Sequence, residues 1–259
     1  MSWVDCQGVV KFESKSCNTC QTPTPTPTPI ASCPDRCPNL LAYPPAQCYF
    51  AADTCKYGWE NNGCPPDLEA NGRCCCTPQT PILIDTTGDG FNLTDYENGV
   101  SFDLSAVGVT SHTSWTAANS DDAFLVLHRN ANGVIDDGSE LFGNVTQQPQ
   151  PPAGTPRNGF FALAEYDKSA NGGNADGLID KHDVVYSSLR LWRDLNHNGT
   201  SEPSELSLLS EWQVQAISLD FKESRRRDEW GNLFRYRSRV EGSKLGRWAY
   251  DVILQSGPR

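Results

Sequence analysis

The chain has 259 residues and a formal net charge of −11, and 37% of its residues are hydrophobic. Nucleic-acid binding depends on Lys and Arg, so this charge argues against nucleic acid as a main partner. The sequence contains no apolar run of about 18 residues, which argues against a membrane-spanning helix. Abundant Pro, Gly, Asn and Asp residues predict many turns between short elements.

All eleven cysteines lie between Cys6 and Cys76. We interpret residues 1–20 as a cysteine-containing head, 21–32 as a Thr-Pro linker and 33–80 as a disulfide-rich module. Disulfides staple small modules in oxidising compartments, so we expect an extracellular or cell-surface protein. Zinc is the alternative, because Cys17-x-x-Cys20 has ligand-like spacing, but residues 1–76 contain neither a histidine nor a second such pair at finger-like distance.

Three further features of this region leave alternatives open. The odd cysteine is either free, paired between chains or paired with the other module. Proline at every second position of residues 22–29 predicts an extended, polyproline-like spacer. The first ten residues lack the segments of a signal peptide. We therefore expect either a start near a processing site with an added Met or an export signal outside this sequence.

Residues 81–259 are predicted to form an α+β domain. Short strands are expected at 82–84, 100–104 and 123–127, and alternating apolar and polar residues predict an antiparallel meander of three strands at 214–221, 233–240 and 247–254. Between these two groups, residues 160–164 and 183–192 have helical patterns. Antiparallel strands would therefore flank a middle of short helices and loops.

The segment 194–205 predicts an EF-hand-like calcium loop. Calcium takes six to eight oxygen ligands, and a twelve-residue loop supplies them from positions 1, 3, 5, 7, 9 and 12, with glycine at position 6. Gly199 occupies position 6, and a helix is expected to begin after the loop with Leu206, Leu208 and Leu209. The six ligand positions are held by Asp194, Asn196, Asn198, Thr200, Glu202 and Glu205.

A second loop precedes the first and fits the same template from position 3 onward. Position 1 falls on Gly172, which has no side-chain oxygen, so Asp167 is expected to replace it, with residues 168–173 looping out. The alternative is a glycine-rich turn before a helix. The predicted ligands are Asp167, Asn174, Asp176, the carbonyl of Leu178, Asp180 and Asp183.

Two more segments match the template less well. In residues 128–140, His128 holds position 1 and the acid comes one residue late, so the segment is either a modified site or a loop held by its own Asx turns. Its candidate ligands are Asn130, Asn132, Asp136 and Glu140. The segment from Asp85 to Gly90 opens in the same way but has Tyr96 at position 12. The recurrence of one template strengthens the calcium prediction.

Several stretches resemble the calcium-binding region of bacterial iron-regulated RTX-type exoproteins, and the loop-helix units resemble dockerin repeats. The stretches are 81–90, 133–143, 158–167 and 191–194. The resemblance covers roughly half of the chain and implies an extracellular module that calcium stabilises. Some of these relatives undergo calcium-triggered cleavage at an Asp-Pro bond, which this sequence does not contain.

We therefore predict a calcium-binding structural module rather than an enzyme. The sequence has no G-x-S-x-G elbow, H-E-x-x-H pair or P-loop. Paired carboxylates such as Asp121 and Asp122 would suit glycoside hydrolysis, but in an acidic protein they are more often surface groups or ion ligands. The alternative function is adhesion or assembly at the cell surface, by self-association or by binding a partner protein or carbohydrate.

Overall fold

The computed structural model describes residues 79–256, except 107, 153–154 and 244, together with the backbone of six short strands in residues 1–78. The predicted disulfide framework, the zinc alternative and the Thr-Pro linker lie outside the described residues. The chain divides into two units, Met1–Pro78 with Gly257–Arg259, and Gln79–Ser256. In the first unit the strands form antiparallel pairs: β1 (Trp3–Val4) with β2 (Val10–Lys11), β3 (Gln47–Ala51) with β4 (Thr54–Gly58), and β5 (Leu68–Ala70) with β6 (Cys76–Pro78).

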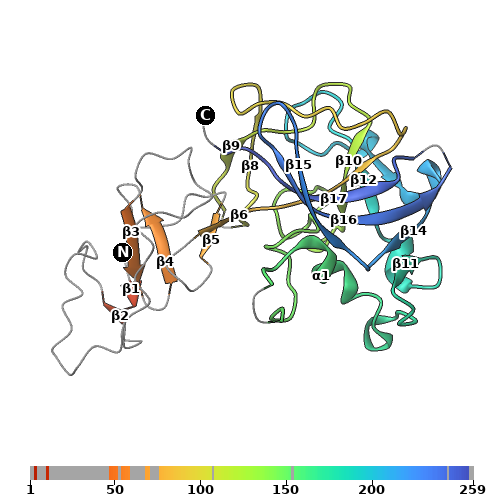
Figure 1. The fold of residues 1–259 in the computed structure, drawn as a ribbon, viewed down its shortest axis with the longest axis horizontal. Coiled ribbons are helices and arrows are strands. Elements are labelled where there is room, and N and C mark those ends of the chain that lie inside the picture. The colour runs from red at the N-terminus through yellow and green to blue at the C-terminus, as the bar shows by residue number, and fades with distance from the viewer. Residues whose placement is uncertain are drawn as a thin grey trace. The chain divides into compact units, whose positions relative to one another are not determined.

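The second unit is built on one curled, antiparallel, nine-stranded sheet (Figure 1). The strands run in the order β11, β14, β16, β17, β7, β10, β12, β13, with β15 also paired to β16. A separate hairpin joins β8 and β9. Strand bounds are β7 Ile82–Asp85, β8 Val100–Phe102, β9 Ser111–Thr113, β10 Asp122–Val126, β11 Leu178–Asp180, β12 Arg190–Trp192, β13 Leu206–Leu208, β14 Val214–Ser218, β15 Lys222–Arg227, β16 Leu233–Gly242 and β17 Trp248–Ile253.

Helix contributes little to this unit. The one α-helix of the described residues is α1 (Gly159–Ala164), and the remaining helical segments are single 3₁₀ turns. Asn158 begins α1 by accepting hydrogen bonds from the backbone N–H groups of Phe160 and Phe161. The turns are η2 Ser169–Asn171, η3 Val184–Ser187, η4 Pro203–Glu205 and η5 Leu209–Trp212. None of the described helices is long and apolar enough to cross a membrane.

The predicted α+β class is therefore wrong. Residues 183–192 form a 3₁₀ turn followed by strand β12, and the helix expected after Glu205 is strand β13. Both strands add to an existing edge, because Leu191 pairs with Leu125 of β10 on one side and with Ser207 on the other. A neighbouring strand that satisfies the backbone overrides a weak helical periodicity in so short a segment.

The strand predictions of the domain agree better with the structure. The expected strands at 82–84, 100–104 and 123–127 correspond to β7, β8 and β10, and the predicted meander corresponds to β14, β16 and β17. Two apolar clusters cover the two faces of the sheet. One contains Ile82 and Ile84 with Phe160 of α1, and the other contains Leu83 and Phe124 with Trp115. Alternate residues of β7 thus enter opposite cores.

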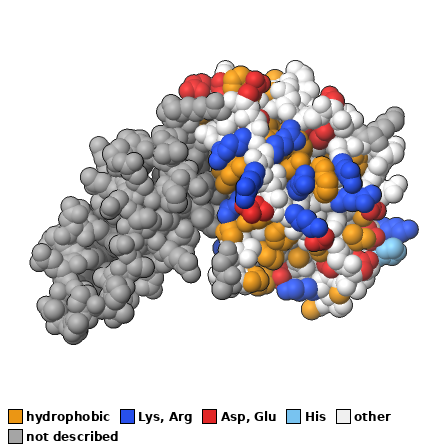
Figure 2. All heavy atoms as spheres, in the orientation of Figure 1, with side chains coloured by type: hydrophobic (Ala, Val, Ile, Leu, Met, Phe, Trp, Pro, Cys, Tyr) orange, Lys and Arg blue, Asp and Glu red, His pale blue; other side chains and the backbone are white. Residues whose placement is uncertain are grey.

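A basic surface lies over β15, β16 and β17, although the whole chain is acidic (Figure 2). The arginines at 225–227 end strand β15, next to the turn that joins it to β16. Apolar rings lie beneath these cations. The guanidinium of Arg226 lies 4.4 Å from the ring centre of Phe234, and that of Arg237 lies 4.6 Å from Trp248. This stacking holds the arginines against the sheet.

Candidate metal-binding loops

The loop 194–205 connects β12 to β13 and folds around the carboxylate of Asp194. This side chain is 1% exposed, and its Oδ1 accepts a hydrogen bond from Asn198 N (3.0 Å) while its Oδ2 accepts one from Gly199 N (2.8 Å). The indole of Trp115, in the core, donates a further bond to Oδ2 (2.9 Å). The side chain at position 1 is thus anchored both to its own loop and to the core.

Glu205 closes the loop from its other end and is also buried. Its Oε1 accepts a hydrogen bond from Leu195 N (2.8 Å), and its Oε2 accepts one from Trp192 Nε1 (3.3 Å). Burial raises the pKa of Glu205, and its hydrogen bond with Glu202 raises it further. The same hydrogen bond lowers the pKa of Glu202. The two carboxyl groups therefore lie close enough for each to affect the pKa of the other.

The exposed side chains of the loop converge on Glu202. The amides of Asn196 and Asn198 donate to Glu202 Oε1 at 3.2 Å and 2.8 Å. Glu202 Oε2 is enclosed and has no hydrogen-bond partner among the described residues. Thr200 donates its backbone N–H to Asn198 Oδ1 (2.7 Å). The polar side chains of the loop are therefore tied to one another by hydrogen bonds.

The loop 167–183 has the same geometry. Asp167 accepts hydrogen bonds from Asp176 N (3.1 Å) and Gly177 N (3.0 Å), so it occupies position 1 while the intervening residues loop out through η2. The carboxylate of Asp183 accepts bonds from Asn174 N (3.3 Å) and Asp180 N (2.8 Å). Leu178 lies between these groups at the start of β11. The structure thus places Asp167 and Asp183 against the backbone of the loop, as the template requires of its first and last positions.

The loop 128–140 repeats the arrangement with an imidazole in place of a carboxylate. His128 Nε2 accepts a hydrogen bond from Gly133 N (2.8 Å). Glu140, fully buried, accepts bonds from Asn130 N (3.4 Å) and Asp136 N (3.2 Å). The amides of Asn130 and Asn132 donate hydrogen bonds to Asp136 at 3.2 Å and 2.7 Å. Burial raises the pKa of Glu140, and its hydrogen bond with Asp136 adds to the rise.

One backbone conformation underlies these loops and the segment that begins at Asp85. In each, the residues at positions 4 and 6 have positive φ, and the side chain at position 1 accepts the N–H of the glycine at position 6. Position 4 is a non-glycine residue in three cases: Ala131 (φ 56°), Ala175 (φ 60°) and His197 (φ 58°). Residues other than glycine are rare in the left-handed region, so their recurrence at position 4 indicates four copies of one loop conformation.

Two of the loops contact each other at equivalent positions. Ile135 N donates to Ser201 Oγ (2.6 Å), and Ser201 Oγ lies 3.3 Å from Ile135 O. Each residue is the eighth of its loop, and both are buried. The loops 128–140 and 194–205 are therefore coupled, because a displacement of one breaks a buried hydrogen bond of the other.

The SPM domain family model matches residues 82–254, which include all of these loops. The chain belongs to the SPM domain family. It is also 36% identical over 145 residues to the iron-regulated protein FrpA of Neisseria meningitidis serogroup C. This match covers 55% of the chain but 12% of FrpA, so the chain spans a small part of that relative. The predicted link to bacterial iron-regulated exoproteins is confirmed, whereas the likeness to dockerin and EF-hand loops stays a prediction.

Three groups of this SPM domain that sequence reasoning missed support the loop 194–205. The indoles of Trp115 and Trp192 donate to its two buried carboxylates. Both ring nitrogens of His197 lie 2.7 Å from backbone carbonyl oxygens, those of Thr116 and Asn98. No local pattern could have indicated the contacts of Trp115 and His197, because they join segments far apart in the chain.

Proposed function

We propose that this SPM domain binds calcium ions in the loops 194–205 and 167–183, and that the ions stabilise its fold. The observation that carries the proposal is the enclosed Oε2 of Glu202, which has no hydrogen-bond partner among the described residues and lies in the same loop as the buried carboxylate of Glu205. A divalent cation would receive oxygens from both acids. Ion binding would then contribute directly to the free energy of folding.

The donor set supports calcium over softer metals. Every candidate ligand in the two loops is a carboxylate, amide, carbonyl or hydroxyl oxygen, and neither set includes sulfur or imidazole. Hard cations take such ligands, and calcium tolerates the irregular geometry of a flexible loop better than magnesium does. Asp194, Asn196, Asn198, Thr200, Glu202 and Glu205 would hold one ion, and Asp167, Asn174, Asp176, Leu178, Asp180 and Asp183 a second.

The third loop, 128–140, would bind an ion less tightly. Imidazole is a poor calcium ligand, so His128 leaves Asn130, Asn132, Asp136 and Glu140 as the candidates. The contact between Ile135 and Ser201 couples this loop to the loop 194–205. Order imposed by an ion in one loop would therefore favour binding in the other.

An extracellular location belongs to the same proposal, since it rests on the resemblance to exoproteins and on the cysteine spacing. Adhesion or fibre assembly depends on residues 1–78 and stays a prediction, as does the expectation that the protein is not an enzyme. The adhesion alternative predicts disulfide-linked or associated chains, whereas the calcium proposal makes no demand on oligomeric state. Size exclusion under non-reducing conditions distinguishes the two.

Calorimetric calcium titration of the full chain tests the proposal. The wild-type protein should bind at least two ions, and the double variant Asp194→Ala/Glu205→Ala should bind one ion fewer. Asp220→Asn is the matched control, because it removes an exposed charge outside the loops and should not change the number of bound ions. No heat of binding at millimolar calcium would overturn the proposal, and an unchanged stoichiometry in the double variant would remove the loop 194–205 from it.

A further inference from the structure

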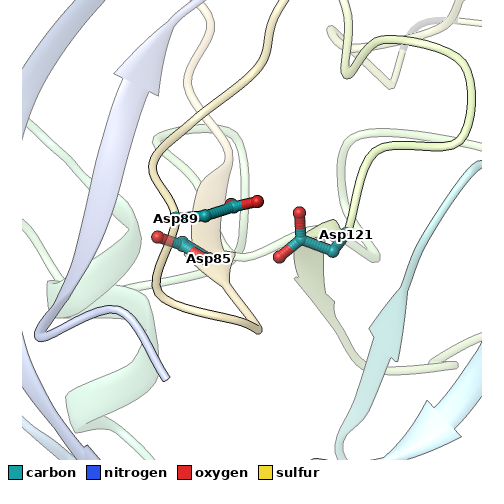
Figure 3. Close-up of side chains that lie close together, drawn as sticks. All are labelled: Asp85, Asp89 and Asp121. Atoms are coloured by element: carbon teal, nitrogen blue, oxygen red, sulfur yellow. The ribbon is translucent and has the colours of Figure 1, made fainter. Parts of the chain in front are cut away.

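Three aspartates outside the loops 128–140, 167–183 and 194–205 converge at the end of strand β7 (Figure 3). Asp85 ends β7, Asp89 lies four residues later, and Asp121 precedes β10. Each offers a carboxylate oxygen, and these oxygens lie within 4.8 Å of one another. Asp85 is buried, Asp121 is half-buried and Asp89 is exposed, so the cluster opens to solvent on one side.

The sheet register, rather than sequence spacing, brings Asp121 to this loop. β7 and β10 are antiparallel neighbours in which Asp122 pairs with Asp85, so the residue before Asp122 reaches the loop that follows Asp85. Thr87 fixes Asp121 there by donating its backbone N–H (2.9 Å) and its hydroxyl (2.8 Å) to Oδ2. Asp121 thus supplies an acid where Tyr96, the twelfth residue of the loop, cannot.

A fourth carboxylate points independently to a bound cation. Asp122 is 0% exposed, and its Oδ2 accepts hydrogen bonds from Asn92 N and Ser120 Oγ, both at 2.7 Å. Its Oδ1 is buried and has no hydrogen-bond partner among the described residues. Because Asp122 lies opposite Asp85 in the register, both side chains project from the same face of the sheet. The hydrogen bond from Asn92 N holds the loop that contains Asp89 close to the carboxylate of Asp122.

The fold leaves these carboxylates without a direct counter-ion. No Lys, Arg or His nitrogen among the described residues lies within 4.0 Å of a carboxylate oxygen of Asp85, Asp89, Asp121 or Asp122. Arg193 is near Asp121, but it forms no ion pair with it. The guanidinium of Arg193 stacks on Trp212 instead, 4.0 Å from the ring centre.

We propose that Asp85, Asp89 and Asp121 form an additional site for a hard divalent cation, with Asp122 behind them as a charge-balancing carboxylate. The donors are all oxygens, which suits calcium or magnesium. The choice of calcium as the occupant rests on the proposed function. The site itself uses none of the residues of the loops 128–140, 167–183 and 194–205, so it is a separate claim. The cation would join β7 to the turn before β10 at the centre of the sheet.

Calorimetric calcium titration of the full chain, with magnesium in a parallel titration, tests this site. The variant Asp89→Asn/Asp121→Asn keeps oxygens that can accept the bonds from Thr87 but removes two charges. It should bind one calcium ion fewer than the wild-type protein, while Asp220→Asn should match the wild type. Circular dichroism of the calcium-free variant checks its fold, and Asp89→Asn alone, at an exposed position, is the replacement if the double variant does not fold.

The outcomes separate this site from the proposed function. If Asp89→Asn/Asp121→Asn retains every ion while Asp194→Ala/Glu205→Ala loses one, the additional site is overturned and the proposed function stands. If the reverse holds, the additional site stands and the loop 194–205 is not a site. If both variants lose one ion, both claims are supported, and if the wild-type chain binds neither cation, both are overturned.

Discussion

The substitution Glu205→Gln separates the two roles of this buried side chain. Without calcium, the Gln oxygen can still accept the hydrogen bonds from Leu195 and Asn196, but its amide nitrogen takes the place of Oε2 and loses the bond from Trp192 Nε1 (3.3 Å). Because burial disfavours the charge, its removal offsets part of that loss, and the stability of the calcium-free protein should change by about 1 kcal/mol or less. With calcium, the variant lacks the carboxylate that closes the loop.

The expected size of the calcium effect follows from linkage. Extracellular calcium modules have dissociation constants of about 0.1–1 mM, so about 10 mM calcium is roughly 10–100 times that constant. One ion then stabilises the folded state by about 1.4–2.7 kcal/mol. A domain of this size gains about 2–4 °C in melting temperature for each kcal/mol. The wild-type protein should therefore melt about 3–10 °C higher with calcium for this one loop.

Thermal melts of both proteins, with chelator and with calcium, measure the difference. The melting temperatures of wild type and Glu205→Gln should agree closely in chelator and differ by that amount in calcium. Glu223→Gln, on the exposed strand β15, should behave as wild type in both conditions. An equal calcium-dependent rise in wild type and Glu205→Gln would refute the role of Glu205 as a ligand.

Three further substitutions test other parts of the structure. Burial raises the pKa of Asp251 from 3.8 to about 6, so its ionisation destabilises the fold progressively between about pH 4 and pH 6 and by a constant amount above that. Asp251→Asn should therefore stabilise the protein by up to about 3 kcal/mol in urea unfolding at pH 8 and have little effect near pH 4. Ser201→Ala removes the acceptor of Ile135 N and should cost about 1–3 kcal/mol in the same assay, and no loss would contradict the coupling of the loops. Gly143→Ala would place a Cβ 1.6 Å from Thr80 O, so we expect no folded protein, and a soluble variant with a native circular dichroism spectrum would contradict this packing.

The sequence predicted the positions of the loops better than it predicted the fold. Position and spacing of oxygen-bearing side chains are local properties, so the pairs Asp194 with Glu205 and Asp167 with Asp183 could be inferred without the structure. The helix expected at 183–192 was wrong because Leu191 and Trp192 pair with a strand more than sixty residues away. Periodicity in a segment of this length does not distinguish a buried strand from a helix.

The cluster of Asp85, Asp89 and Asp121 also could not be predicted from local sequence, because strand pairing brings its members together. The segment at Asp85 opens like the other loops, but its remaining acid, Asp121, is supplied through the pairing of β7 with β10. Sequence spacing alone therefore indicated that the loop beginning at Asp85 lacks an acid at its twelfth position, where Tyr96 stands. Likewise, the indoles of Trp115 and Trp192 reach the buried carboxylates only because two strands and a connecting loop pack in one core.

A crystal structure of the full chain grown with calcium tests the central claim most directly. The claim predicts an ion in the loop 194–205, about 2.3–2.6 Å from oxygens of Asp194 and Glu205, with the side-chain oxygens of Asn196 and Asn198 turned toward it. The contrary result is a loop in saturating calcium that holds no ion and keeps both amide nitrogens bonded to Glu202.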